Sequence, residues 1–148
     1  MKQEETIDFH IKRTWQNIAK MYNEVAGGYG ATMATGFVLL NIDRQNGTPS
    51  TALGPKMGME ATSLSRILKS MDQKGLIERR PNPDDGRGVL IFLTEFGIEK
   101  RGDAKKAVME FNQAIFSEIS EQKINVFFDV LTTINELINR KKIYQQEV

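Results

Sequence analysis

The apolar residues of this chain change from helical to strand spacing and back once, and this limits the folds it can adopt. Up to Lys74 they recur every three or four residues, which is the helical period. Segments 76–80 and 89–93 are typical of strands, and the segment 81–88 between them is rich in turn formers. Helical spacing returns after Thr94. The pattern predicts a mainly α-helical chain with one β-hairpin that has a long tip.

Six helical segments are expected around this hairpin. The first begins with Thr6 as its N-cap and ends at the glycines of segment 27–30. The second runs from about Thr32 to Asn46, where Gly47-Thr48-Pro49 stops it.

Segment 50–76 holds two shorter helices with a turn at Gly58 between them. Ser50 is the candidate N-cap of the first, and the second covers about 61–74 with Gly75 as its C-terminal cap. The apolar face of this second helix consists of Leu64, Ile67, Leu68 and Met71.

The first helix and the last two carry long apolar stripes. Thr94 and Ser120 are the candidate N-caps of the last two. The stripe of the first helix consists of Ile7, Ile11, Trp15, Ile18, Tyr22 and Val25. Such stripes can pack within one chain, or they can form a dimer interface from both chain ends. The sequence leaves both interpretations open.

The composition excludes several classes of site. There is no cysteine, so disulfides and thiol chemistry are absent, and His10 is the sole histidine, so we expect no metal or cofactor. No apolar run approaches the ~18 residues of a membrane span. The polar start lacks a signal-type apolar core, so the expected location is cytoplasmic. With a net charge of +1, DNA binding would depend on local charge placement.

Gly54, Gly58 and Leu64 have the spacing of a helix-turn-helix. A small residue allows two helices to approach closely, a glycine accepts the backbone of the tight turn, and the apolar residue packs the second helix on the first. Pro55 departs from this pattern because proline removes a backbone donor inside a helix. The helix that contains it is therefore expected to be very short or to start late.

Segments 53–79 and 85–97 together resemble the multiple antibiotic resistance regulator (MarR) family. In that family the wing and the next helix are marked by an aspartate, an arginine two residues later and a Leu-Thr-x-x-Gly ending. The corresponding residues here are Asp85, Arg87, Leu93-Thr94 and Gly97. In length and element order the resemblance covers the whole chain.

The resemblance implies a single winged helix-turn-helix domain over residues 1–148. Its DNA-binding region would cover about 31–94, and dimerisation helices would cover about 1–30 and 95–148. The implied function is a DNA-binding transcription regulator. It would act as a homodimer on a pseudo-palindromic operator, as a ligand-responsive repressor.

The helix that begins at Ala61 is the candidate recognition helix, since the major groove of DNA admits an α-helix. Its residues away from the apolar face are Thr62, Ser63, Ser65, Arg66, Lys69 and Ser70. Arg66 could contact guanine or a phosphate, and Lys69 a phosphate. The alternative is an ordinary solvated helix face, which the preceding turn signature disfavours.

The wing supplies four further candidate DNA contacts. The resemblance implies that Arg87 enters the minor groove, and Asp85 would orient it through a charge-assisted hydrogen bond. Arg79 and Arg80 could contact phosphates, or one of them could pair with an acidic neighbour. The alternative for the hairpin tip is a surface turn with a solvated ion pair, which contributes little.

The resemblance also implies a small aromatic or lipophilic effector that adjusts the spacing of the recognition helices. The candidate pocket residues are Trp15, Tyr22, Tyr29, Met33 and Phe37. A stripe of aromatic and methionine residues at helical spacing also fits an ordinary core.

Two other classes of function are less consistent with the sequence. Asp84 and Asp85 are adjacent on a loop and make a poor general acid–base pair, and no nucleophile or phosphate-loop motif is present, so the chain is not expected to be an enzyme. A winged-helix module for protein–protein assembly alone is the main alternative. Retention of Arg66, Lys69 and Arg87 argues against it.

Overall fold

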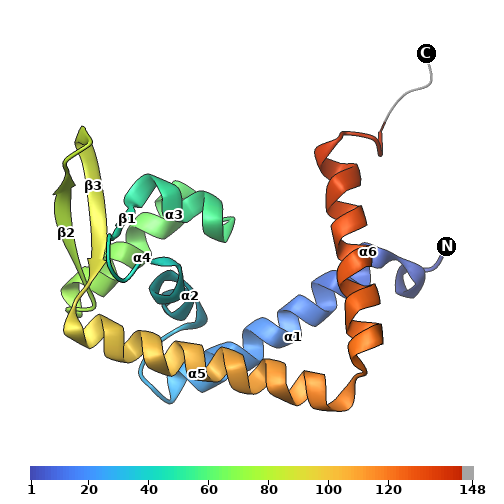
Figure 1. Cartoon of the computed structure of the whole chain (residues 1–148). Helices are drawn as coiled ribbons and strands as arrows, with labels where there is room; N and C mark the ends of the chain where they lie inside the picture. Colours follow the sequence, from blue (N-terminus) through green and yellow to red (C-terminus); the bar gives the residue numbers. More distant parts are fainter. Residues whose placement is uncertain (145–148) are drawn as a thin grey trace. The chain divides into compact units, whose positions relative to one another are not determined.

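The computed structural model describes residues 1–144, with the exception of the side chain of Arg87. The chain divides into two compact units, residues 1–107 and Val108 onward, and each is described by itself. Figure 1 labels the elements. In chain order they are η1 (Gln3–Glu5), α1 (Ile7–Gly27), α2 (Met33–Asn41), β1 (Thr48–Pro49), α3 (Ser50–Met57), α4 (Ala61–Gln73), β2 (Ile77–Asn82), β3 (Asp85–Leu93), α5 (Glu95–Glu118) and α6 (Glu121–Asn139). The prediction of a mainly α-helical fold with a β-hairpin wing is confirmed.

Helix α1 begins and ends as predicted, but its N-terminus is not capped by the expected side chain. The hydroxyl of Thr6 donates to the carbonyl oxygen of Gln3 (2.7 Å) and makes no capping bond to α1. His10 lies one turn later and donates from Nε2 to the carbonyl oxygen of Glu4 (2.6 Å). Both side chains therefore form hydrogen bonds with η1, the preceding 3₁₀ turn, which was not predicted from the sequence.

Helix α2 ends at Asn41, and the prediction that it continues to Asn46 was wrong. The carboxylate of Asp43 accepts hydrogen bonds from the backbone N–H groups of Gln45 (2.8 Å) and Asn46 (3.0 Å). A short acidic side chain that bonds nearby amides competes with the helix, so a turn forms instead. Thr48 then accepts from the backbone N–H of Asp43 (2.8 Å), which begins β1.

The short helix α3 runs through Pro55, which lies in its last turn. Ser50 is the first helical residue and Pro49 occupies the N-cap position, so the prediction of Ser50 as N-cap was wrong by one residue. A Cβ at buried Gly54 would come within 3.1 Å of a carbonyl oxygen, and Gly58 has a φ of 61°. Both glycines therefore have the roles that the helix-turn-helix spacing predicts.

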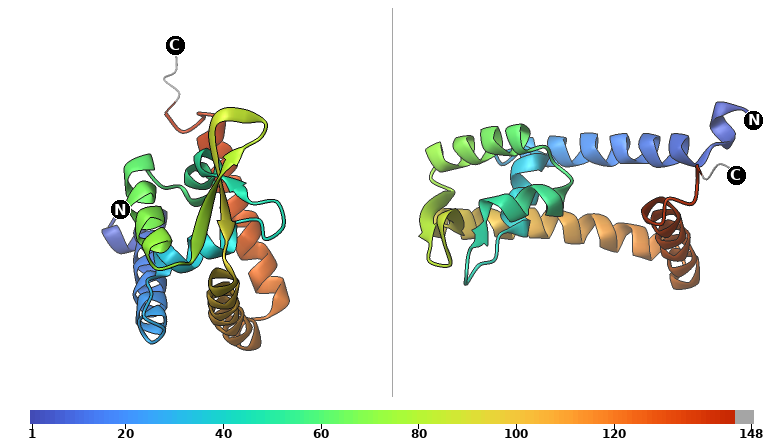
Figure 2. Two further views of the ribbon diagram at one scale, coloured as in Figure 1. Left: turned by 90° about the vertical axis from the view of Figure 1, so that its left-hand side faces the viewer. Right: turned by 90° about the horizontal axis from the view of Figure 1, so that it is seen from above.

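The hairpin is tighter than predicted, because most of the expected loop 81–88 is strand. β2 and β3 pair antiparallel as far as Asn82↔Asp85, so Pro83 and Asp84 form the tip. Pro81 is tolerated because β2 is an edge strand in the order β1-β3-β2. Strand β1, which was not predicted from the sequence, pairs with the other side of β3. Figures 1 and 2 show the hairpin beside α3 and α4.

The core of the first unit lies between α2, α3, α4 and the sheet. It consists of Val38, Leu39, Ile42, Leu53, Leu64, Leu68, Met71, Leu76, Ile77, Ile91 and Leu93. The predicted apolar face of α4 is confirmed in this core, with Ile67 at its half-buried margin. The predicted cap of α5 is also confirmed, since the backbone N–H of Gly97 donates to the hydroxyl of Thr94 (3.0 Å).

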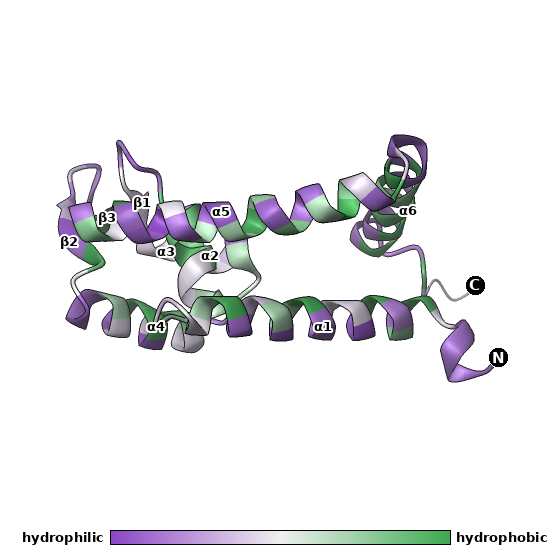
Figure 3. Ribbon diagram, turned by 90° about the horizontal axis from the view of Figure 1, so that it is seen from below, coloured by the Kyte–Doolittle hydropathy of each residue, from purple (hydrophilic) through white to green (hydrophobic). Residues whose placement is uncertain are grey.

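The second unit contains the end of α5 and all of α6. Ser120 caps α6 as predicted, accepting from the backbone N–H of Lys123 (3.3 Å). Ile124 is buried, but other large apolar residues are exposed, and Figure 3 shows hydrophobic residues along α6. Those exposed residues on α5 and α6 include Phe116, Val126, Phe127, Phe128, Val130 and Ile138. Within residues 1–144, no helix has the length and apolar character to cross a membrane.

Candidate nucleic-acid interface

Helix α4 turns its polar residues away from the core. Burial of Leu64, Leu68 and Met71 fixes the rotation of the helix about its axis. The exposed predicted residues are Thr62, Ser63, Ser65, Arg66 and Lys69. Ser70, the sixth predicted contact, is half-buried at the edge of this face. The polar surface of α4 is therefore continuous and rich in hydroxyl and cationic groups.

The two cations of this surface are available to a ligand. Neither Arg66 nor Lys69 forms an ion pair or hydrogen bond in the described part of the chain. At the start of α4, Glu60 occupies the N-cap position but makes no side-chain capping bond. The first backbone N–H groups of the helix can thus donate to a phosphate.

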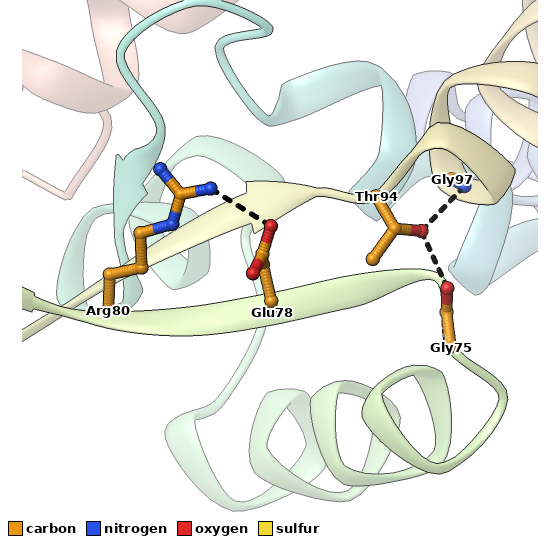
Figure 4. Close-up of polar contacts among 5 residues, drawn as sticks. All are labelled: Gly75, Glu78, Arg80, Thr94 and Gly97. Atoms are coloured by element: carbon orange, nitrogen blue, oxygen red, sulfur yellow. Dashed lines mark hydrogen bonds and ion pairs between the residues drawn. The ribbon is translucent and has the colours of Figure 1, made fainter.

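The two arginines of β2 are both paired, and they lie on opposite faces of the hairpin. Nε of Arg79 lies 3.4 Å from a carboxylate oxygen of Asp72 on α4. Arg80 donates to Glu78 (2.9 Å), as Figure 4 shows, and its guanidinium carbon lies 4.2 Å from the centroid of the Phe92 ring. Successive side chains of a strand point to opposite faces. Only Arg79 therefore shares a face with α4.

The tip of the wing carries the other predicted contacts. Asp85 and Arg87 both belong to β3, and a Cβ built at Gly88 would lie 3.2 Å from Oδ2 of Asp85. The Asp85 carboxylate is therefore folded back against the Gly88 backbone. The side chain of Arg87 is outside the described part of the structure, so its pairing with Asp85 stays a prediction.

The predicted effector residues do not all come together. The rings of Trp15 on α1 and Phe37 on α2 are stacked with centroids 6.5 Å apart, and Tyr22 meets Phe37 edge-on at 6.0 Å. Burial raises the pKa of the Tyr22 hydroxyl. Met33 is half-buried at the start of α2. Tyr29 instead lies beside Lys100 of α5, whose Nζ is 5.9 Å from its ring centroid.

Several contacts at this interface were not anticipated from the sequence. Glu78 and Arg80 are two residues apart on a strand, so their side chains share a face and can pair. Strand alternation in the sequence could have predicted this ion pair. The stacking of Arg80 on Phe92 depends on strand register, which the sequence did not specify. The second hydrogen bond of the Thr94 hydroxyl, to the carbonyl oxygen of Gly75, had no sequence signal at all.

A comparison with known protein families finds a match for this arrangement of helices and strands. The model of the MarR family matches residues 31–89, the segment that contains α2, α3, α4 and most of the hairpin. In this segment the chain is similar to the MarR family.

Named relatives of the chain are found among transcription regulators. It is 30% identical over 87 residues to the HTH-type transcriptional regulator YdgJ of Bacillus subtilis (strain 168), an alignment that covers 59% of this chain and 53% of YdgJ. The match thus spans about half the length of that relative. The family and the relatives are regulators of transcription, not enzymes.

Two solved structures share the fold of this chain. The S. aureus MepR–DNA complex superimposes with a TM-score of 0.82 at 20% identity, covering 88% of this chain and 97% of MepR. CouR from Rhodococcus jostii RHA1 bound to p-coumaroyl-CoA superimposes with a TM-score of 0.79 at 24% identity, covering 90% of this chain and 94% of CouR. The likeness therefore extends beyond the segment that the family model matches.

Proposed function

We propose that this chain is a DNA-binding transcription regulator that acts as a homodimer on a pseudo-palindromic operator. The observation that carries the proposal is the exposed face of α4, where Arg66 and Lys69 have no partner among the described residues. An unpaired arginine can bond a guanine edge in two places, and an unpaired lysine can neutralise a phosphate. The proposed location is the cytoplasm, because a bacterial DNA-binding regulator must reach the chromosome there.

The wing supports the same proposal. Arg79 shares the α4 side of the hairpin, and its ion pair with Asp72 is solvent-exposed and so of low strength. Arg79 can therefore exchange its partner for a phosphate. The fold is also that of MepR, which has been solved with DNA bound.

Exposed apolar residues favour a dimer over a monomer. Ile7 and Trp15 on α1 are 62% and 50% exposed, and Phe127 on α6 is 53% exposed. Large apolar side chains that stay exposed within each unit are typical of surfaces where proteins associate. A twofold dimer would place two α4 helices about one DNA turn apart, which calls for a pseudo-palindromic operator.

We further propose that a small aromatic or lipophilic effector controls the affinity for DNA, so that the chain acts as a ligand-responsive repressor. The stacked rings of Trp15 and Phe37 join α1 to α2. A ligand that separates or clamps these rings would bias the spacing of the two recognition helices. CouR, with the same fold, was solved with p-coumaroyl-CoA. Repression fits a dimer that occupies a promoter and blocks polymerase sterically.

Selection of bound fragments from a genomic DNA pool tests the proposal. We expect enrichment of a pseudo-palindromic sequence, with an affinity that falls steeply as salt concentration rises. The alternative is a winged-helix module for protein–protein assembly that does not bind DNA. Absence of any salt-dependent DNA binding at low ionic strength would favour that alternative.

A further inference from the structure

The hydroxyl of Thr94 bridges two helices. It donates to the carbonyl oxygen of Gly75 (2.6 Å), just after α4, and accepts from the backbone N–H of Gly97 (3.0 Å), in the first turn of α5. Figure 4 shows both bonds. The backbone N–H of Thr94 also donates to the carbonyl oxygen of Leu76 (3.1 Å). One residue therefore joins the end of α4, the start of β2 and the start of α5.

The junction leaves little room for movement. A Cβ on buried Gly97 would clash with the carbonyl oxygen of Leu76, so the backbone of α5 lies directly against the segment that leaves α4. Thr94 and Gly97 fix this contact from two sides, one by hydrogen bonds and one by close packing. A change in the direction of α4 relative to the first turn of α5 would have to break at least one of them.

We propose that Thr94 is a positioning residue for DNA binding: its hydroxyl holds α4 at the angle to α5 that lets the recognition helix enter the groove. The inference rests on the proposed function. If the bridge is lost, α4 samples several angles, and the apparent affinity falls in proportion to the fraction of protein in the competent state. Thr94 itself need not touch DNA.

Two variants of Thr94 separate its hydroxyl from its shape. Thr94→Val keeps the branched shape and loses both hydroxyl bonds, whereas Thr94→Ser keeps the hydroxyl. Thr32→Val is the matched control, because Thr32 caps α2 by accepting from the backbone N–H of Thr35 (3.3 Å) but bridges no second helix. Affinity for a selected operator is measured by fluorescence anisotropy well below the melting temperature of every variant, with the active fraction fixed by stoichiometric titration.

We expect Thr94→Val to weaken operator binding by about five- to tenfold, the scale of one or two lost hydrogen bonds. Thr94→Ser and Thr32→Val should stay within about twofold of the wild type. Thr94→Val should also discriminate less between operators whose half-sites are moved apart by one base pair, because its α4 direction is less fixed. A general loss of stability would not change this preference.

Three results would overturn the inference. If Thr94→Val binds and discriminates like a wild type that does bind DNA, the positioning role is wrong and the proposed function stands. If Thr32→Val weakens binding as much as Thr94→Val, the effect is one of stability and the role is again wrong. If the wild type itself does not bind DNA, the proposed function fails and this inference fails with it.

Discussion

The winged-helix segment 31–94 and the helices outside it differ in how far their apolar side chains are buried. In the described part of segment 31–94 no large apolar side chain is more than about a third exposed, and Leu53, Met71 and Ile91 are fully buried. On α6, by contrast, Phe127 and Phe128 are about half exposed. The first region completes its core within one chain. The second presents apolar surface that a second copy of the chain would bury in the proposed dimer.

The largest expected effect is in the complete core. Met71→Ala should lower the free energy of unfolding by about 2–5 kcal/mol, because it leaves a cavity where the surroundings cannot collapse. Urea denaturation followed by circular dichroism measures the change. Lys74→Ala, just after α4 and exposed, is the control and should change it little. A Met71→Ala loss no greater than that of the control would mean that this core is not well packed.

The next effect tests the incomplete surface. Phe127→Lys should weaken self-association by about 2 kcal/mol or more, since an aromatic side chain that the proposed dimer would bury is replaced by a charge. Sedimentation equilibrium measures the association constant, and circular dichroism should show the helices retained. Asn125→Lys adds the same charge two residues away at an exposed polar position and should leave association intact. Equal association of both variants would refute the assignment of this surface.

A smaller effect is expected at the recognition helix. Arg66→Ala should reduce operator affinity by about 1–3 kcal/mol if Arg66 bonds a guanine, and should lower the salt dependence if it bonds a phosphate. Arg13→Ala, which removes the same charge from exposed α1, is the matched control. Anisotropy titrations at several salt concentrations distinguish these cases. Equal losses in the two variants would mean that only net charge matters.

The smallest effect concerns the turn that ends α2. Backbone hydrogen bonds from Asn46 and then Gln45, with the charge of Lys56, hold the pKa of Asp43 below its usual 3.8. A carboxyl group whose pKa is lower in the folded protein than in the unfolded chain stabilises the fold at pH values above the unfolded pKa. This stabilisation is lost as the pH falls through the folded pKa. Asp43→Asn keeps the acceptor but does not titrate. Its melting temperature should fall slightly less than that of the wild type below about pH 4, whereas an identical acid slope would contradict the assignment.

The positions of the main helices and strands could be predicted from the sequence better than the ends of the helices and the length of the hairpin. Apolar spacing located α4 and both strands, since burial of Leu64, Leu68 and Met71 leaves a periodic trace. The end of α2 was missed because the choice between helix and turn at Asp43 depends on one side chain. The length of the wing was missed because its turn-forming residues are compatible with an edge strand once a partner is present.

The candidate site shows the same division. The exposed face of α4 followed from periodicity, so Arg66 and Lys69 were placed correctly on the surface. The separation of Arg79 from Arg80 followed from strand alternation but was overlooked. The position of Tyr29 beside Lys100 was not anticipated, because Lys100 comes from a distant part of the chain. Contacts between distant segments depend on tertiary packing, which local pattern does not encode.

In the proposed assembly, two copies of the chain are joined through the exposed apolar helices, and each presents its α4 to one operator. The most direct test is the mass of the complex formed when the protein is titrated onto a selected operator duplex and followed by analytical ultracentrifugation. We expect two chains on each duplex, and Phe127→Lys should fail to form that complex at the same concentration. A complex of one chain per duplex with undiminished affinity would contradict it.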